Sequence, residues 1–291
     1  MSRTLRLGLT LVGAIVLLAV VGPALVGDPD ALVARPLEPP SAAHWLGTTG
    51  QGQDVLAQLV WGARTTLRVS VLAGAAMVGL GALVGVAGGY LRGGADRVGS
   101  LLTQLFLVLP GLPLMVVVAA WLPPGPSTIA VVLALTGWAW NARVLRAATL
   151  ALRERDFVRA AELAGEPGWR VVALELGPHL LPLLGAALVG ATVYALGAQV
   201  GLEFLGLGDL DAVTWGTSLY WASNDAALLT GSWWTFVPTG VLVALTGSGL
   251  TLIQMGLDEL AHPRLRAVRE AEARTGRRWT GVTPVLERPR D

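Results

Sequence analysis

Long runs without a charged side chain recur along the sequence and predict membrane-spanning helices. A helix needs about 20 predominantly apolar residues to cross a bilayer. The uncharged runs are 7–27, 69–91, 98–142, 176–202 and a stretch of 226–257 that starts near Trp233. Because the run 98–142 is too long for one span and Pro123-Pro124-Gly125-Pro126 interrupts it, we divide it into two helices.

None of these runs alternates between apolar and polar positions as a strand would, and only helices or closed barrels can span a bilayer. The sequence therefore predicts an all-α integral membrane protein with six transmembrane helices. The first run could instead be a signal peptide, since Arg3 and Arg6 precede it. Its length exceeds the usual apolar core of about 7–15 residues and no A-x-A cleavage site follows, so we expect a retained helix.

Arginine is distributed unevenly between the two sides of the predicted membrane protein. If the N-terminus is cytoplasmic, the cytoplasmic segments are the N-terminus, the turn 92–97, the loop 143–175 and the tail after residue 258. These segments contain 2, 2, 6 and 8 arginines, which is 18 of the 21 in the chain. Cytoplasmic loops are enriched in basic residues. We therefore expect both termini in the cytoplasm of a multi-pass protein of the cytoplasmic membrane.

The spans divide the chain into four parts. Residues 1–27 form an N-terminal transmembrane helix, and residues 28–64 form an extracytoplasmic segment. Residues 65–260 form a core of five transmembrane helices that includes a charged loop at 152–178, and residues 261–291 form a cytoplasmic tail. Gly81, Gly85 and Gly89 lie four residues apart on the second helix. Small residues at this spacing let helices approach closely, which predicts packing within the chain or against a partner.

Composition narrows the chemistry that the chain can perform. It is 53% hydrophobic and 14% charged, against about 25% charged in soluble proteins, and its net charge of +1 gives no reason to expect nucleic acid. Cysteine and lysine are absent, which excludes thiol catalysis and a Walker A lysine. We find no catalytic residues and no metal site, and the glycine-rich "GTTGQGQD" is a poor phosphate cradle. Energy for any transport must come from elsewhere.

The polar segment 155–182, between two apolar runs, predicts a helix–turn–helix at the membrane surface. Four residues fall on one helical face: Phe157, Ala160, Ala161 and Ala164. Gly165 and Pro167-Gly168 predict a turn, after which Trp169 returns the chain to the interface. A small-residue face with charged edges suits docking into a groove on another protein, but an ordinary amphipathic loop helix would show the same spacing.

This segment resembles the EAA loop of ABC-importer permeases, in which Glu-Ala-Ala is followed by a glycine and a hydrophobic-Pro ending. The residues that match are Ala160, Ala161, Gly165 and Pro178. The residues before the segment resemble the same family's Trp-x-x-x-Ala-Arg-x-x-Arg sequence, through Trp138, Ala142, Arg143 and Arg146.

Three further stretches resemble dipeptide, oligopeptide and nickel permeases. They are "HWLGTTGQGQDVLAQLVWGAR" at 44–64, "LEFLGLGDLDAVTWG" at 202–216 and "GLDELAHPRLR" at 256–266. The order of motifs and the single N-terminal helix resemble the DppC/OppC type of this group. The sequence departs from the family pattern at six positions: Arg159 for Glu, Thr49 for Asp, Gln53 for Arg, Glu203 for Ser, Glu175 for His and His179 for Asn.

The resemblance implies a type I ABC importer permease fold with a cytoplasmic coupling helix. It implies four kinds of partner, namely a homologous second permease, two ATPase subunits, an extracytoplasmic substrate-binding protein and the bilayer. The chain itself would need no cofactor, since ATP and Mg²⁺ would be bound by the ATPases. The residues expected to couple to them are Arg159, Ala160, Ala161, Glu162, Ala164 and Gly165.

The cargo implied by the resemblance is short peptides, and nickel chelates or another small solute are the alternatives. Glu203 and Asp209 are candidate contacts for the cargo or the binding protein, although a solvated interfacial side chain is the simpler interpretation of Glu203. A different class, the ion-coupled secondary transporter, is less consistent with the sequence, because such proteins keep ionisable groups within the bundle and often contain inverted repeats.

Overall fold

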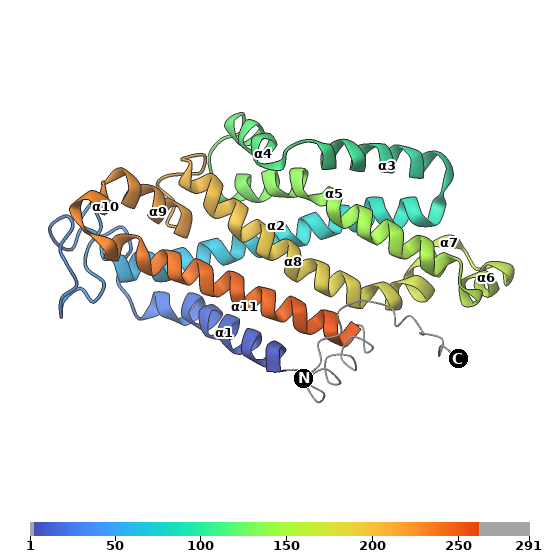
Figure 1. Cartoon of the computed structure of the whole chain (residues 1–291), viewed down its shortest axis with the longest axis horizontal. Coiled ribbons are helices and arrows are strands. Elements are labelled where there is room, and N and C mark those ends of the chain that lie inside the picture. Colours follow the sequence, from blue (N-terminus) through green and yellow to red (C-terminus); the bar gives the residue numbers. More distant parts are fainter. Residues whose placement is uncertain (1–2, 262–291) are drawn as a thin grey trace, which may run out of the picture.

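A computed structural model describes residues 3–261, and the predicted tail from residue 262 onward lies outside them. Within this range the regular elements are helices, accompanied by two isolated β-bridges, Leu32–Gln53 and Thr48–Asp54. The elements, shown in Figure 1, are α1 (Arg3–Val21), η1 (Gly22–Ala24), α2 (Val55–Leu91), α3 (Gly93–Val108), α4 (Gly111–Ala120), α5 (Pro126–Arg153), α6 (Asp156–Leu163), α7 (Gly168–Arg170), η2 (Val171–Leu176), α8 (Gly177–Phe204), α9 (Trp215–Asn224), α10 (Ala227–Thr230), η3 (Trp233–Thr235) and α11 (Val237–Ala261).

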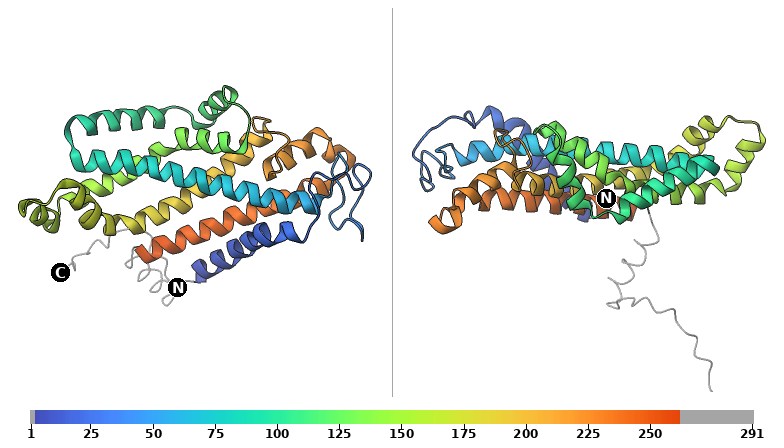
Figure 2. Two further views of the ribbon diagram at one scale, coloured as in Figure 1. Left: turned by 180° about the vertical axis from the view of Figure 1, so that it is seen from behind. Right: turned by 90° about the horizontal axis from the view of Figure 1, so that it is seen from above.

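The described helices include five that are long and apolar enough to cross a membrane, and the bent pair of α3 and α4 adds a sixth if it counts as one span. This confirms the predicted all-α membrane fold. The right-hand view of Figure 2 shows that the helices form a slab that is broader than it is thick. Charged loop helices α6 and α7 project from one end of the slab, and α9 and α10 lie at the other (Figure 1). We call these the α6 end and the α9 end.

Helices α2 and α5 form the most extensive helix pair, and glycines make it possible. A Cβ atom on Gly81 would lie 2.6 Å from Cβ of Asn141, and one on Gly89 would lie 2.8 Å from Cβ of Thr149. A Cβ on Gly85 would meet the carbonyl oxygen of Ala142. The glycine stripe predicted on the second span therefore packs within the chain.

A second close pair joins the first and last spans. Gly8 and Gly249 have no side chain, which lets α1 pack closely against α11. A Cβ on Gly256 would lie 2.6 Å from Cβ of Leu5. The start of α1 and the end of α11 are therefore neighbours. Both lie toward the α6 end of the bundle in Figure 1.

The third predicted span differs from expectation because it is not one continuous helix. Helix α3 ends at Val108, α4 begins at Gly111, and their axes are inclined by 95°. Pro110 lacks an amide hydrogen and disfavours helical backbone in the residue before it. Leu109 accordingly has φ −67° and ψ 134°, which is extended. The uncharged run gave no sign of this break, since no charged residue interrupts the sequence there.

The second span begins 14 residues earlier than the uncharged run that predicted it. Asp54 caps the helix by accepting a hydrogen bond from the Ala57 amide at 3.0 Å, so α2 starts at Val55. Arg64 lies within this first part of α2, with its guanidinium 5.8 Å from the centre of the Trp61 ring. Long basic side chains near the end of a span can extend to the membrane interface, which explains why arginine does not end the helix.

Candidate functional site

The charged loop at the α6 end is anchored to the bundle by a small apolar cluster. Val158 of α6 is fully buried among Val171, Leu176 and Leu180, which precede or begin α8. Phe157 also faces the bundle, and its ring stacks on His179 with 4.9 Å between centroids. Helix α6 is therefore packed against the bundle through Phe157 and Val158.

Ion pairs fix the same loop from its polar side. Glu162 lies 3.6 Å from Arg153 at the end of α5, and Glu166 lies 3.2 Å from Arg170 across the turn. A further exposed pair, Arg92–Glu154 at 3.5 Å, joins the α2–α3 turn to the start of the loop. Exposed pairs contribute little individually, but these three link α6 and its flanking turns to neighbouring segments.

The turn after α6 has the geometry of a Schellman motif. The amide of Gly165 donates to the carbonyl of Glu162 at 3.1 Å, and the amide of Glu166 donates to the carbonyl of Ala161 at 3.2 Å. Gly165 has φ +81°, a left-handed conformation that favours glycine. The predicted helix–turn–helix with a glycine turn is thus confirmed.

Seating α6 through Val158 leaves an outward surface formed by Arg159, Ala160, Leu163, Ala164 and Trp169, which we call the α6–α7 surface. Leu163 is 90% exposed and Trp169 is 73% exposed, which is unusual for such large apolar side chains.

The predicted face of four residues is wrong in part, because Phe157 and Ala161 pack toward the bundle while Ala160 and Ala164 face outward. Of the six residues expected to couple to a partner, Arg159, Ala160, Ala164 and Gly165 lie on or beside the α6–α7 surface, whereas Ala161 and Glu162 contact the rest of the chain. Leu163 was missed, although its spacing of three and four from Ala160 and Arg159 places it on the same face.

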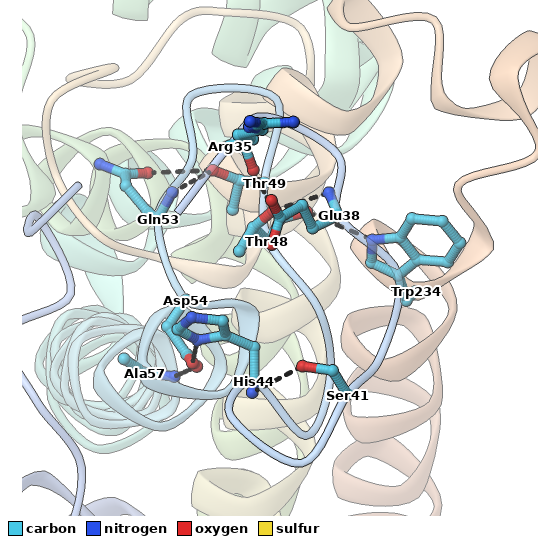
Figure 3. A network of polar contacts seen from close by, with 10 residues as sticks. All are labelled: Arg35, Glu38, Ser41, His44, Thr48, Thr49, Gln53, Asp54, Ala57 and Trp234. Carbon is cyan, nitrogen blue, oxygen red and sulfur yellow. Dashed lines mark hydrogen bonds and ion pairs between the residues drawn. The ribbon is translucent and has the colours of Figure 1, made fainter. Parts of the chain in front are cut away.

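At the α9 end, the connection between α1 and α2 is an ordered loop (Figure 3). The hydroxyl of Thr48 donates to the carbonyl of Arg35 at 2.7 Å and accepts from the amide of Glu38 at 2.8 Å. The indole of Trp234 donates to the carbonyl of Thr48 at 3.2 Å, which ties the loop to the start of the last span.

The same loop is closed onto the start of α2. His44 Nδ1 lies 2.9 Å from Oδ2 of Asp54, the residue that caps α2, and the side chain of Thr49 accepts from the Gln53 amide at 3.1 Å (Figure 3). Gly47 and Gly52 have positive φ, at +70° and +86°. The glycine-rich motif therefore forms a folded connection, in which Thr48, Thr49 and Asp54 make hydrogen bonds within the chain.

Glu203 lies at the end of α8 and is only 2% exposed. Its carboxylate accepts hydrogen bonds from Gln199 Nε2 at 3.0 Å and from Thr214 Oγ1 at 2.6 Å. The glycines of the surrounding motif allow this burial, since a Cβ on Gly208 would lie 3.0 Å from Cγ of Glu203. The alternative of a solvated, interfacial Glu203 is therefore wrong, and its contact with cargo or a binding protein stays a prediction. Asp209 is partly exposed, and it accepts a hydrogen bond from the Asp211 amide at 3.1 Å.

Trp215 completes the buried core of the α9 end. Its ring is fully buried, its indole donates to the carbonyl of Leu59 at 3.0 Å, and its backbone amide donates to Thr66 Oγ1 at 3.0 Å. Gly62 leaves space for the ring on α2. The "TWG" part of the motif therefore fixes α9 against α2. Among residues 3–261, no group of three or more His, Cys, Asp or Glu side chains could hold a metal ion.

Comparison with known proteins agrees with this architecture. A family described as "Binding-protein-dependent transport system inner membrane component" matches residues 77–267. The dipeptide transport system permease protein DppC of Bacillus subtilis is 33% identical over 272 residues, covering 89% of this chain and 81% of that protein. A putative peptide transport system permease protein of Brucella suis is 30% identical over 270 residues, covering 91% and 89%. The oligopeptide transport system permease protein OppC of Mycobacterium tuberculosis is 32% identical over 242 residues, covering 80% and 81%.

Proposed function

The chain belongs to the family of binding-protein-dependent transport system inner membrane components, and on this premise we propose that it is a permease subunit of an ATP-driven importer of short peptides. The relatives named as dipeptide and oligopeptide permeases support this cargo. The five or six apolar helices supply the multi-pass membrane body that a permease requires.

The observation that carries the proposal is the α6–α7 surface. It combines exposed large apolar side chains, Leu163 and Trp169, with the small residues Ala160 and Ala164 on a firmly anchored helix. A surface of this kind suits a groove on a partner, because exposed apolar area on a rigid element loses little entropy on binding. We place an ATPase subunit there, so that its closure moves α6 and swings the bundle as a rigid body.

In this proposal the chain itself is not an enzyme. ATP and Mg²⁺ are bound by two ATPase subunits, a homologous second permease completes the membrane body, and a substrate-binding protein delivers the peptide at the α9 end. The loop 152–178 and both termini then lie in the cytoplasm. The arginine distribution supports this orientation. The contact between Leu5 and Gly256 also supports this orientation, because the contact places the start of α1 and the end of α11 on the same side of the bundle.

Reconstitution of the complete transporter in proteoliposomes tests this function. With ATP inside and the binding protein outside, labelled trialanine should accumulate, and it should not accumulate with a non-hydrolysable ATP analogue. Uptake of a nickel chelate but not of peptides would replace the cargo. Uptake driven by an ion gradient without ATP would instead indicate an ion-coupled secondary transporter and would refute the proposal.

A further inference from the structure

A partly open cavity of about 710 Å³ is lined by residues of α3, α4, α5, α8 and α11 and by Met77 of α2. Its volume is within the range of about 300–1,000 Å³ that is typical of sites for small molecules. Most of its walls are apolar, contributed by residues such as Leu145, Ala187 and Val193. None of the motifs that fix the α6 end or the α9 end accounts for this space.

Several polar side chains in these walls have no hydrogen-bond partner among residues 3–261. They are Asn141 and Trp140 of α5, Tyr194 of α8 and Gln254 of α11. By contrast, the hydroxyl of Thr136, which lines the same cavity, donates to the carbonyl of Val132 at 2.8 Å. Trp140 and Tyr194 are 63% and 45% exposed, whereas Asn141 is buried and Gln254 is half-buried, so the side-chain amides of Asn141 and Gln254 are the unpaired groups that the cavity leaves available to a ligand.

Asn141 is the most constrained of the four. It is only 7% exposed, and its Cβ packs against Gly81 of α2. Among residues 3–261, no side-chain nitrogen or oxygen atom of Asn141 or Gln254 is both fully buried and without a hydrogen bond. The Asn141 amide therefore keeps accessible area, and the cavity that it lines is the space available to a partner group.

We propose that Asn141 and Gln254 hydrogen-bond the main-chain amide groups of a peptide as it crosses this subunit. A side-chain amide carries both a donor and an acceptor, which match the carbonyl and N–H of a peptide group. Every peptide offers these groups whatever its side chains, and the apolar walls can accommodate varied side chains. The one charged residue lining the cavity among those described is Asp258, which is exposed near the end of α11.

This assignment rests on the proposed function, and its test compares an amide with an ester. The reconstituted transporter takes up either labelled trialanine or an analogue in which one amide is replaced by an ester, which removes the N–H donor. For the wild type we expect uptake of the ester to be lower by about fivefold, the effect of one lost hydrogen bond. In Asn141→Leu, uptake of trialanine should fall toward that of the ester, so that the ratio of the two approaches one.

The comparison controls for the binding protein, which is the same in every assay. Thr136→Val is the matched control, because its hydroxyl is already used within α5, and it should keep the wild-type ratio. Gln254→Leu tests the cavity from α11 and should also reduce the ratio.

Wild-type ratios in both Asn141→Leu and Gln254→Leu would overturn this inference while leaving the proposed function standing. Loss of the second permease from purified Asn141→Leu and Gln254→Leu complexes would also overturn it, because the cavity would then be a subunit contact. Absence of ATP-dependent trialanine uptake by the wild type would refute the proposed function, and this inference with it.

Discussion

Thr214 donates a hydrogen bond to the carboxylate of Glu203, with 2.6 Å between Thr214 Oγ1 and Glu203 Oε2. This bond joins the end of α8 to the residue that caps α9. The other carboxylate oxygen accepts from Gln199, whose own side-chain oxygen accepts from Ser70 of α2 at 3.0 Å. A single buried hydrogen-bond network therefore links three helices at the α9 end of the bundle.

Removing the carboxylate should destabilise this end of the protein. In Glu203→Ala, the hydroxyl of Thr214 and the amide of Gln199 lose their acceptor in a buried site, at a cost of about 1–3 kcal/mol for each group. We expect a lower thermal unfolding midpoint in detergent, measured by fluorescence. The control is Glu154→Ala, which removes an exposed ion pair and should shift the midpoint little. Equal midpoints for both variants would contradict the structural role of Glu203.

Asp225, after α9, should make stability depend on pH. Burial raises the pKa of its carboxyl group, and a hydrogen bond from the Gly50 amide only partly opposes this. Because the pKa is higher in the folded state than in the unfolded state, the folded state loses stability as the pH rises above about 4. Asp225→Asn removes the titration, so the variant should gain stability relative to the wild type between about pH 4 and pH 7. Unfolding midpoints across this range test the expectation, and a constant difference would refute it.

The sequence predicted the elements that depend on local properties of the chain. Uncharged runs located the spans, since each helix needs about 20 predominantly apolar residues to cross a bilayer. Gly165 predicted its turn because glycine adopts a positive φ at little cost. The glycine stripe of α2 predicted close packing for the same local reason, although the choice of α5 as its partner needed the structure.

What the sequence could not predict depends on contacts between distant residues. The burial of Glu203 could not be predicted, because its hydrogen-bond donor Thr214 lies 11 residues further along the chain and approaches it only in the folded protein. The outward direction of Leu163 follows from the burial of Val158, and either residue could have faced the bundle. The bend at Pro110 was missed because hydropathy does not detect a missing amide hydrogen.

The α6–α7 surface should be needed for association with the ATPase. Leu163→Asp replaces the most exposed large apolar side chain of this surface with a charge and leaves the buried Val158 anchor unchanged. We expect co-purified ATPase and transport to fall by at least about tenfold, because a charge must be desolvated in the contact. Leu229→Asp is the control, since Leu229 is equally exposed but lies at the α9 end. Normal ATPase recovery with Leu163→Asp would remove the main support for the proposed docking site.

Single cysteines should report the orientation of the bundle, since the native chain contains none. Trp45→Cys and Leu229→Cys should react with a membrane-impermeant maleimide in intact spheroplasts, whereas Leu163→Cys should react only after permeabilisation. All three positions are well exposed, so access depends on the side of the membrane. Met115→Cys, at a fully buried position, provides the unreactive control. The opposite labelling pattern would reverse the proposed topology.

Gly165 should control the shape of the loop independently of any partner. Its φ of +81° is strained for a β-branched residue, at a cost of about 1–3 kcal/mol, even though a side chain there would meet nothing within 4 Å. In Gly165→Val we expect the Schellman turn to open and trypsin to cleave faster at Arg159 and Arg170, measured in detergent. Gly165→Asn should be cleaved at nearly the wild-type rate, because asparagine tolerates this conformation. Equal cleavage of the valine and asparagine variants would show that backbone strain at Gly165 does not hold the turn.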